Sequence, residues 1–103
     1  MAANEPRMTP QTLRLLAAML ASTRDEHAGA EIGREANLRS GSLYPILARL
    51  EEAGWLSSRW ETEDPRALGR PRRRYYRLTA VGARQAAAAF RPFEAAVRRL
   101  AWS

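Results

Sequence analysis

The sequence contains no cysteine and no lysine, and His27 is its single histidine. Without cysteine the chain has neither a disulfide framework nor thiolate ligands for a metal ion, and it is compatible with a reducing compartment. Cysteine and lysine nucleophiles are absent, and the glycines are too scattered to form a phosphate-binding loop. These absences argue against an enzyme, and we expect no cofactor and no metal site. His27, beside Asp25 and Glu26, is more typical of a loop residue than of a weak metal ligand.

Long hydrophobic runs are also missing. The longest apolar stretches, around residues 13–21 and 86–90, are far shorter than the roughly 20 residues of a membrane-spanning helix. The N-terminus lacks the basic and then apolar segments of a secretory signal. With 103 residues and 46% hydrophobic content, the sequence predicts one modest core in a soluble, cytoplasmic protein.

Positive charge is concentrated in the second half of the chain. Residues 1–58 hold six arginines and seven acids, whereas residues 59–103 hold eleven arginines and four acids. Six of these arginines fall within twelve residues, at Arg66, Arg70, Arg72, Arg73, Arg74 and Arg77. Such a cluster repels itself and is favourable mainly near an anion, which makes nucleic-acid phosphate the leading partner. The alternative for a basic run taken alone is a solvated, solubilising loop.

An apolar-periodic segment ends shortly before this cluster. Its apolar residues recur at three and four residue spacing, at Leu43, Ile46, Leu47 and Leu50. This spacing predicts a helix with one buried face. Ser40 or Ser42 can cap its start, and Gly54 suits the left-handed position at its end. Pro45 is tolerated only in a first helical turn, which independently places the start near residues 40–42.

The segment after this helix predicts a β-hairpin with a basic loop. Residues 55–62 have the pattern of a strand, residues 63–71 that of a loop, and residues 72–78 that of a return strand, after which Thr79 caps another helix. Strand alternation predicts that Tyr76 packs on the core, together with Leu56, Leu78 and Trp60.

Two further helices are predicted upstream, after a flexible N-terminus over residues 1–8. Thr9 and Pro10 have the pattern of a helix start, and a short helix follows near residues 29–36. The predicted fold is therefore mainly α with a small β-hairpin. It is a winged helix-turn-helix domain over residues 9–79 with an N-terminal helix, followed by a long C-terminal dimerisation helix over residues 80–103.

Candidate DNA-contacting residues follow from this layout, in which the first turn of the second helix faces the major groove. In that turn they are Arg39, Ser40, Gly41, Ser42 and Tyr44. In the wing we expect backbone or minor-groove contacts from Arg70, Arg72, Arg73 and Arg74. Neighbours on a strand point to opposite faces, so not all four can contact DNA. The helix lacks Asn and Gln, which favours phosphate contacts as the main source of affinity.

Apolar side chains also predict an interface between two copies of the chain. On the C-terminal helix they recur at Phe90, Phe93, Val97 and Leu100, with no further chain to cover them. On the first helix, a face of Leu13, Leu16, Ala17 and Leu20 is predicted to point to the core. Leu15 and Met19 form a second apolar strip on the same helix. We assign this strip to the interface between the two copies or to an effector site at that interface. Pro92 is expected to kink or interrupt the last helix.

Two sequence blocks resemble the PadR family of bacterial transcriptional regulators. They are GSLYPILARLEEAGW at residues 41–55 and RRRYYRLTAVG at residues 72–82, and the resemblance spans about residues 13–82. It implies a winged-helix domain, a homodimer built through the C-terminal helix, and repression by binding a palindromic operator. Relatives commonly carry His-Gly-Tyr-Glu-Ile where this chain has HAGAEI at residues 27–32, so the packing of that helix stays open.

The short C-terminal tail resembles the small members of that family, some of which bind planar hydrophobic drugs at the dimer centre. Phe93 stands where those relatives carry a ligand-stacking tryptophan, so the resemblance is compatible with a planar hydrophobic effector. Plain packing is the more common role of aromatics at such an interface.

The sequence therefore predicts a homodimer that binds double-stranded DNA and represses transcription. The alternative is a winged-helix protein-interaction module without specific DNA binding, which the long basic wing disfavours. RNA is a weaker candidate because the sequence shows no ladder of exposed aromatics for stacking single strands.

Overall fold

Thr9 begins the first helix as its sequence predicts. In the computed structural model, which describes residues 5–102 and side chains through residue 101, helix α1 covers Pro10–Ala21. The Thr9 hydroxyl accepts a hydrogen bond from the Thr12 backbone N–H at 3.1 Å, and Pro10 occupies the first turn, where a missing N–H costs little. The predicted flexible segment of residues 1–8 lies partly outside the described residues.

The buried face of α1 differs from the predicted one. Leu15 and Met19 are 0% and 5% exposed and lie in the core beside Leu16. Ala17 and Leu20, predicted for the core, are exposed. Leu15 and Met19 therefore pack within their own protomer and offer no surface to a second copy, contrary to the assignment made from the sequence. Leucine and alanine lie on nearly every side of this helix, so its pattern does not select one face.

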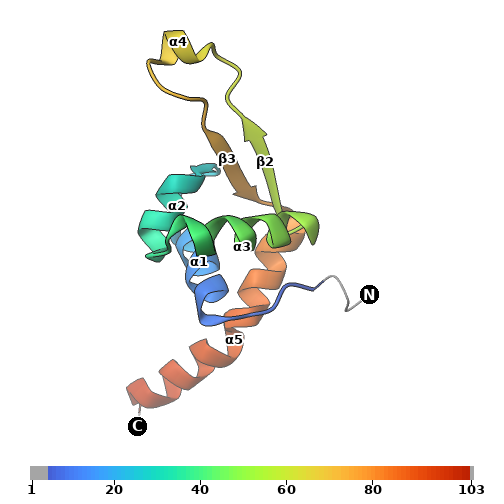
Figure 1. Ribbon diagram of the computed structural model, residues 1–103. Helices are drawn as coiled ribbons and strands as arrows, with labels where there is room; N and C mark the ends of the chain where they lie inside the picture. The colour runs from blue at the N-terminus through green and yellow to red at the C-terminus, as the bar shows by residue number, and fades with distance from the viewer. Residues whose placement is uncertain (1–4, 103) are drawn as a thin grey trace.

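A helix-turn-helix follows, as predicted. Helix α2 covers Gly29–Ala36, and Asn37 ends it in the left-handed conformation with a φ of 56°. Helix α3 covers Ser40–Glu52, and its apolar face is buried as the periodicity predicts. In Figure 1, α3 crosses in front of α1, and α2 lies beside the N-terminal end of α3.

The ends of α3 confirm one prediction and correct another. Gly54 has a φ of 83°, the left-handed conformation expected of it. Arg39 is the N-cap residue and makes no side-chain capping bond. Capping by Ser40 or Ser42 is therefore wrong, because both residues already lie inside the first turn. The first backbone N–H groups of α3 have no side-chain cap.

The β-hairpin belongs to a larger sheet than predicted. Within the described residues, strands β1 (His27–Ala28), β2 (Leu56–Trp60) and β3 (Arg74–Leu78) form an antiparallel sheet in the order β1-β3-β2. The hairpin loop contains a one-turn helix, α4 (Pro65–Leu68), which the side chain of Asp64 caps. The two-residue strand β1 was not predicted, because so short a segment carries no alternation.

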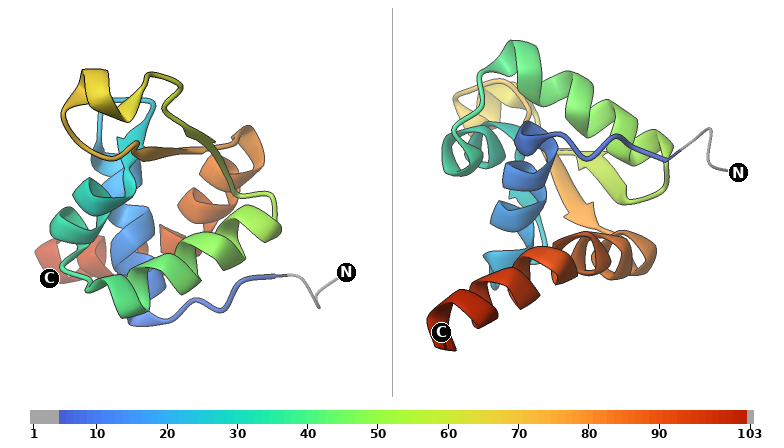
Figure 2. Two further views of the ribbon diagram at one scale, coloured as in Figure 1. Left: turned by 45° about the horizontal axis from the view of Figure 1, so that its top comes forward. Right: turned by 90° about the horizontal axis from the view of Figure 1, so that it is seen from below.

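The last helix, α5, covers Ala80–Trp102. The Thr79 hydroxyl accepts a hydrogen bond from the Gly82 N–H at 3.0 Å, which confirms Thr79 as its cap. Pro92 lies inside α5 and does not interrupt it. Figure 2 shows that α5 starts beside the helical body and then extends past it.

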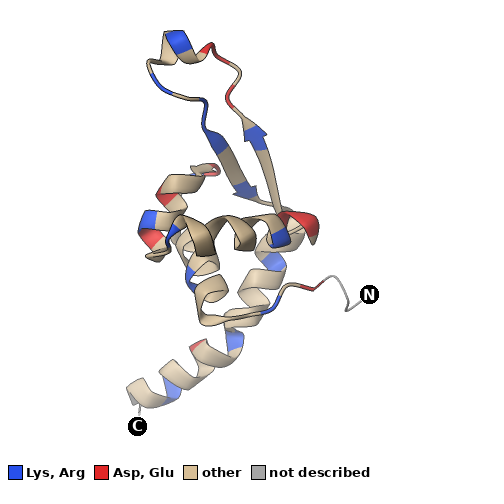
Figure 3. Ribbon diagram, viewed as in Figure 1, with Lys and Arg blue, Asp and Glu red and all other residues tan. Residues whose placement is uncertain are grey.

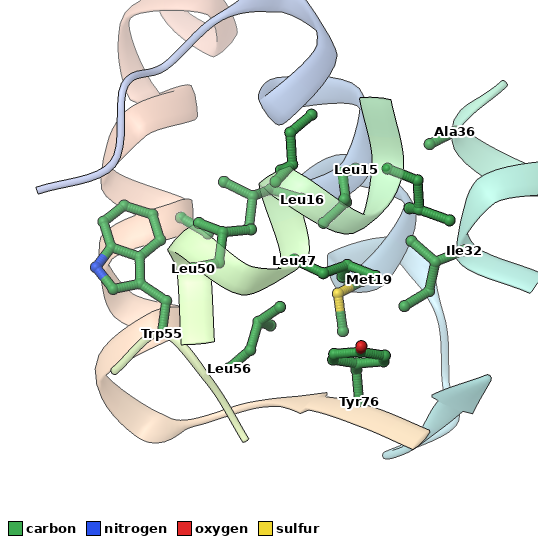
Figure 4. Close-up of a cluster of buried hydrophobic side chains, with 13 residues drawn as sticks. Leu15, Leu16, Met19, Ile32, Ala36, Leu47, Leu50, Trp55, Leu56 and Tyr76 are labelled. Carbon is green, nitrogen blue, oxygen red and sulfur yellow. The ribbon is translucent and has the colours of Figure 1, made fainter. Parts of the chain in front are cut away.

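The core lies between α1, α2, α3 and the base of the sheet (Figure 4). It contains Leu15, Leu16, Met19, Ile32, Ala36, Leu43, Ile46, Leu47, Leu50, Trp55, Leu56, Tyr76 and Ala86. Tyr76 packs there as predicted, but Trp60 does not, since it is 55% exposed. Burial falls along β2 from Leu56 to Trp60, because the strand runs from the core toward the hairpin loop, which stands clear of the helices in Figure 1.

The whole chain is elongated, with extents of 57 × 33 × 25 Å. The hairpin with α4 stands clear of the helices at one end, and α5 extends at the other (Figure 1). No helix in the described part of the chain is long and apolar enough to cross a membrane.

Candidate nucleic-acid interface

The first turns of α3 present an exposed surface. Leu43 and Ile46 point into the core, which leaves Ser40, Gly41 and Tyr44 on the outer side of the helix. A groove of about 530 Å³ runs between α2 and this end of α3, and it brings Arg39, Ser40 and Tyr44 together with Ala30, Gly33, Arg34, Asn37, Leu38 and Leu43. Ser42 does not line this groove. Arg34 was missed from the sequence, since its place at the end of α2 becomes relevant only after the two helices pack.

The uncapped start of α3 adds a favourable electrostatic term. A helix N-terminus carries roughly half a positive charge, and its unpaired N–H groups point outward. Because Arg39 supplies no capping bond, the first turn of α3 can donate to a phosphate oxygen.

The wing, residues 61–73, carries exposed arginines (Figure 3). Arg72 donates from Nε to the backbone carbonyl of Glu63 at 2.9 Å, which leaves its terminal nitrogens to solvent. Arg73 is exposed, and no side-chain hydrogen bond or ion pair of Arg73 occurs among the described residues. Both side chains are exposed, and their predicted contact with phosphate stays a prediction.

Arg70 has a different position from the one predicted. Its two terminal nitrogens donate to both carboxylate oxygens of Glu61, at 2.6 and 3.0 Å. The same carboxylate accepts the Arg73 backbone N–H at 2.7 Å. The Arg70 hydrogen bond, and then the Arg73 backbone bond, lower the pKa of Glu61 to about 2. Arg70 therefore braces the wing across its two sides and is not presented to a ligand.

Arg74 is also engaged within the protein. It donates to the Ser58 hydroxyl at 2.9 Å and to a Glu51 carboxylate oxygen at 3.1 Å. Its guanidinium carbon lies 5.5 Å from the ring centre of Trp60 and 5.6 Å from that of Tyr76. Arg74 thus links the base of the wing to the end of α3. Because its guanidinium is already engaged, Arg74 is a weaker candidate for DNA contact than Arg72 or Arg73.

A second groove, of about 390 Å³, separates the base of the wing from the helices. It is lined by Ala28, Gly29, Ala30, Tyr44, Trp60, Arg72, Arg73, Arg74 and Tyr76. Tyr44 is 46% exposed and lines both grooves, so they meet at its side chain. The predicted Tyr44, Arg72 and Arg73 are thereby brought onto one face. Trp60 was missed because strand alternation placed it on the same face as buried Leu56.

Glu61→Gln is expected to weaken the DNA binding that the sequence predicts several-fold, although it removes a negative charge beside the exposed arginines of the wing. The amide cannot hold the Arg70 fork and the Arg73 N–H as the carboxylate does, so the wing loosens. The folded pKa lies below the usual 4.5, so the brace is complete above that value and is lost as the pH falls toward 2.

Glu63→Gln is the matched control for the Glu61 variant. It removes the same charge two residues away, and no hydrogen bond to its carboxylate occurs in the described structure. Fluorescence anisotropy with labelled DNA at neutral pH would compare the two variants. Stronger binding by both would show that net charge outweighs the geometry of the wing.

His27 is buried in β1 and is not the loop residue that its sequence neighbours suggest. Its Nδ1 atom has no hydrogen-bond partner among residues 5–102. Within the described residues, no group of three or more His, Cys, Asp or Glu side chains is placed to hold a metal ion.

Exposed apolar side chains continue along α5 beyond the core. Phe93, Val97 and Leu100 are 57%, 65% and 77% exposed. Phe90 is half-buried against the protomer's own core. The predicted stripe is therefore divided: Phe90 packs internally, whereas Phe93, Val97 and Leu100 are exposed. Leu15 and Met19 lie on the internal side.

The helix-turn-helix followed by a basic antiparallel hairpin defines a winged-helix domain. The PadR-like family of transcriptional regulators matches residues 18–88, which is more than half of the chain. The chain belongs to this family, whose members are transcriptional regulators and not enzymes. A search of curated proteins found no match.

Solved structures agree with this assignment. The chain is similar to overoxidized AbfR bound to DNA, with a TM-score of 0.67 and 26% identity over 86% of this chain and 60% of that one. It is also similar to reduced AbfR bound to DNA, with a TM-score of 0.56 and 31% identity over 78% of this chain and 51% of that one. AbfR is from Staphylococcus epidermidis. The chain thus spans about half to two thirds of the length of the AbfR chains. A PadR family regulator from Clostridium difficile R20291 matches with a TM-score of 0.64 and 19% identity, over 89% of this chain and 98% of that one. At this identity the match shows the fold alone.

Proposed function

We propose that this chain is a homodimeric repressor that binds a palindromic operator. The observation that carries the proposal is the shared face of the uncapped start of α3, Tyr44, Arg72 and Arg73. It combines a helix end that fits the major groove with two arginines open to phosphate. The two AbfR structures contain DNA, which supports this use of a similar fold.

The dimer is proposed from the exposed part of the α5 stripe, which a second copy can cover. Two copies related by a two-fold axis present two α3 helices to two half-sites. An interface lined by Phe93 also has the aromatic character that a planar hydrophobic effector requires. Such an effector would act by shifting the angle between the two DNA-reading units.

The protein-interaction module remains the competing function. It would leave the exposed arginines to an acidic partner, and it needs no DNA preference. The experiment below separates the two functions.

The test is a binding titration against the DNA upstream of the protein's own gene, with random DNA as competitor, at two salt concentrations. We expect a preference for the upstream fragment of about a hundredfold or more. Replacing Arg72 and Arg73 by alanine is expected to weaken binding to both DNAs, and to reduce the salt slope by roughly 2 for each protomer, about 0.9 for each lost phosphate contact.

Arg59→Ala with Arg77→Ala is the control, because it removes two positive charges from the opposite face of the hairpin. This pair is expected to change the salt slope much less. Equal slopes for the two double variants would remove Arg72 and Arg73 from the phosphate-binding role. Absence of binding to either DNA at low salt would favour the protein-interaction module.

A further inference from the structure

Trp60 is an exposed tryptophan that does not belong to the hydrophobic core. It is 55% exposed, it lies at the end of β2 where the hairpin leaves the helical body, and it lines the groove at the base of the wing. A large aromatic ring left in water at such a position indicates a contact surface rather than packing.

The ring of Trp60 is held in place by its neighbours. The Arg74 guanidinium lies against it at 5.5 Å, and Arg74 is itself fixed by Ser58 and Glu51. These contacts fix one side of the indole, while the residue as a whole stays 55% exposed. A restrained ring loses less conformational freedom on binding than a mobile one.

The same groove combines aromatic and cationic groups. Tyr44 supplies a second half-exposed ring from α3, and Arg72 and Arg73 supply exposed guanidinium groups. The opposite wall consists of Ala28, Gly29 and Ala30, whose small side chains leave the groove open. Aromatic faces suit a deoxyribose or a base, and the arginines suit a phosphate.

We propose that this groove binds one nucleotide unit of the DNA backbone. In this arrangement the sugar lies on Trp60 and Tyr44, and its phosphate is bound by Arg72 and Arg73. Trp60 is thereby a DNA-contacting residue, and Arg74 is a positioning residue that acts through it. The inference rests on the proposed function. DNA is favoured over a small ligand because Tyr44 joins this groove to the one beside α3, so a strand that passes from α3 to the wing crosses it.

The experiment measures binding of the full-length protein to the upstream fragment and to random DNA. Trp60→Ala is expected to weaken binding to both DNAs roughly tenfold or more, whereas Trp60→Phe retains most of the affinity. Combining Trp60→Ala with Arg73→Ala should cost less than the sum of the single changes, since both residues bind the same nucleotide. Arg77→Ala, on the other strand face, serves as the charge control.

A second measurement tests contact directly. In a Trp102→Phe background the fluorescence arises from buried Trp55 and exposed Trp60. DNA is expected to protect Trp60 from acrylamide quenching, with Trp60→Phe as the reference that identifies its signal. A Trp60→Ala affinity within twofold of wild type, together with unchanged quenching, would overturn the inference alone. Protection by sodium benzoate but not by DNA would overturn it in favour of a small aromatic anion. Failure of the wild-type protein to bind any DNA would overturn the proposed function itself.

Discussion

Replacing Gly82 by alanine is expected to lower the thermal midpoint by up to about 15 °C. A Cβ atom at this position would lie 1.9 Å from the Trp55 carbonyl oxygen, 2.7 Å from its carbonyl carbon and 2.8 Å from its Cα atom. All three are backbone atoms, so no side-chain rotation relieves the clash. The start of α5 must therefore move away from the turn between α3 and β2.

This movement is costly because the same contact is fixed by hydrogen bonds. The Trp55 carbonyl accepts the Thr79 N–H at 2.9 Å, and the Thr79 hydroxyl lies 2.6 Å from the Gly54 carbonyl oxygen. The Trp55 ring is buried in the core beside α5 (Figure 4). Overpacking costs about 1–3 kcal/mol and sometimes more, whereas alanine gains only about 1 kcal/mol of helix propensity over glycine. We therefore expect the steric cost to exceed the gain in helix propensity and the variant to be less stable than wild type.

Gly41→Ala is the matched control, since Gly41 is also helical and a Cβ atom there meets nothing within 4 Å. It is expected to leave stability unchanged or to raise it by up to about 1 kcal/mol. Thermal unfolding followed by circular dichroism, at one fixed protein concentration, compares the two variants. A Gly82→Ala midpoint at or above that of wild type would show that the close approach of the two backbones is not required.

The elements that sequence analysis predicted well are those whose signals are local. Thr9, Gly54 and Thr79 mark helix ends through contacts within a few residues, and the periodicity of α3 has one clear face. The face of α1 was wrong because it depends on which neighbours pack against an almost uniformly apolar helix. In the same way, β1 exists only because β3 is present to pair with it.

The sequence predicted the region of the candidate site, but not which of its arginines are engaged within the protein and which are exposed. The start of α3 near residue 40 was predicted correctly, and with it which of its residues are exposed, but the reason given was wrong: Pro45 is the sixth residue of α3 and lies inside the helix, not in its first turn. The four wing arginines look equivalent in sequence, but the acids that engage two of them are distant along the chain. Glu61 is nine residues from Arg70, and Glu51 is 23 residues from Arg74. The closed hairpin brings Glu61 to Arg70, and β3 brings Arg74 to Glu51 at the end of α3. Only this folded arrangement distinguishes Arg72 and Arg73 from the other two.

Phe93→Asp is expected to dissociate the proposed dimer and thereby to abolish tight operator binding. Burying a phenylalanine is worth about 1.5–3 kcal/mol, and a two-fold interface contains each residue twice. The substitution therefore removes roughly 3–6 kcal/mol and adds two charges that would have to be buried. A loss of this size raises the dissociation constant by at least about a hundredfold. Sedimentation equilibrium measures the assembly, and the operator titration measures its consequence.

Ala95→Asp controls for the added charge, because Ala95 is exposed on α5 but lies about 200° around the helix from Phe93. It should leave both assembly and operator binding close to wild type. Since Phe93 is itself 57% exposed in the protomer, Phe93→Asp should not unfold the chain, and circular dichroism checks this directly. A dimer that survives Phe93→Asp would place the interface elsewhere. A monomer that still binds the full operator tightly would show that α3 and the wing suffice without a second copy.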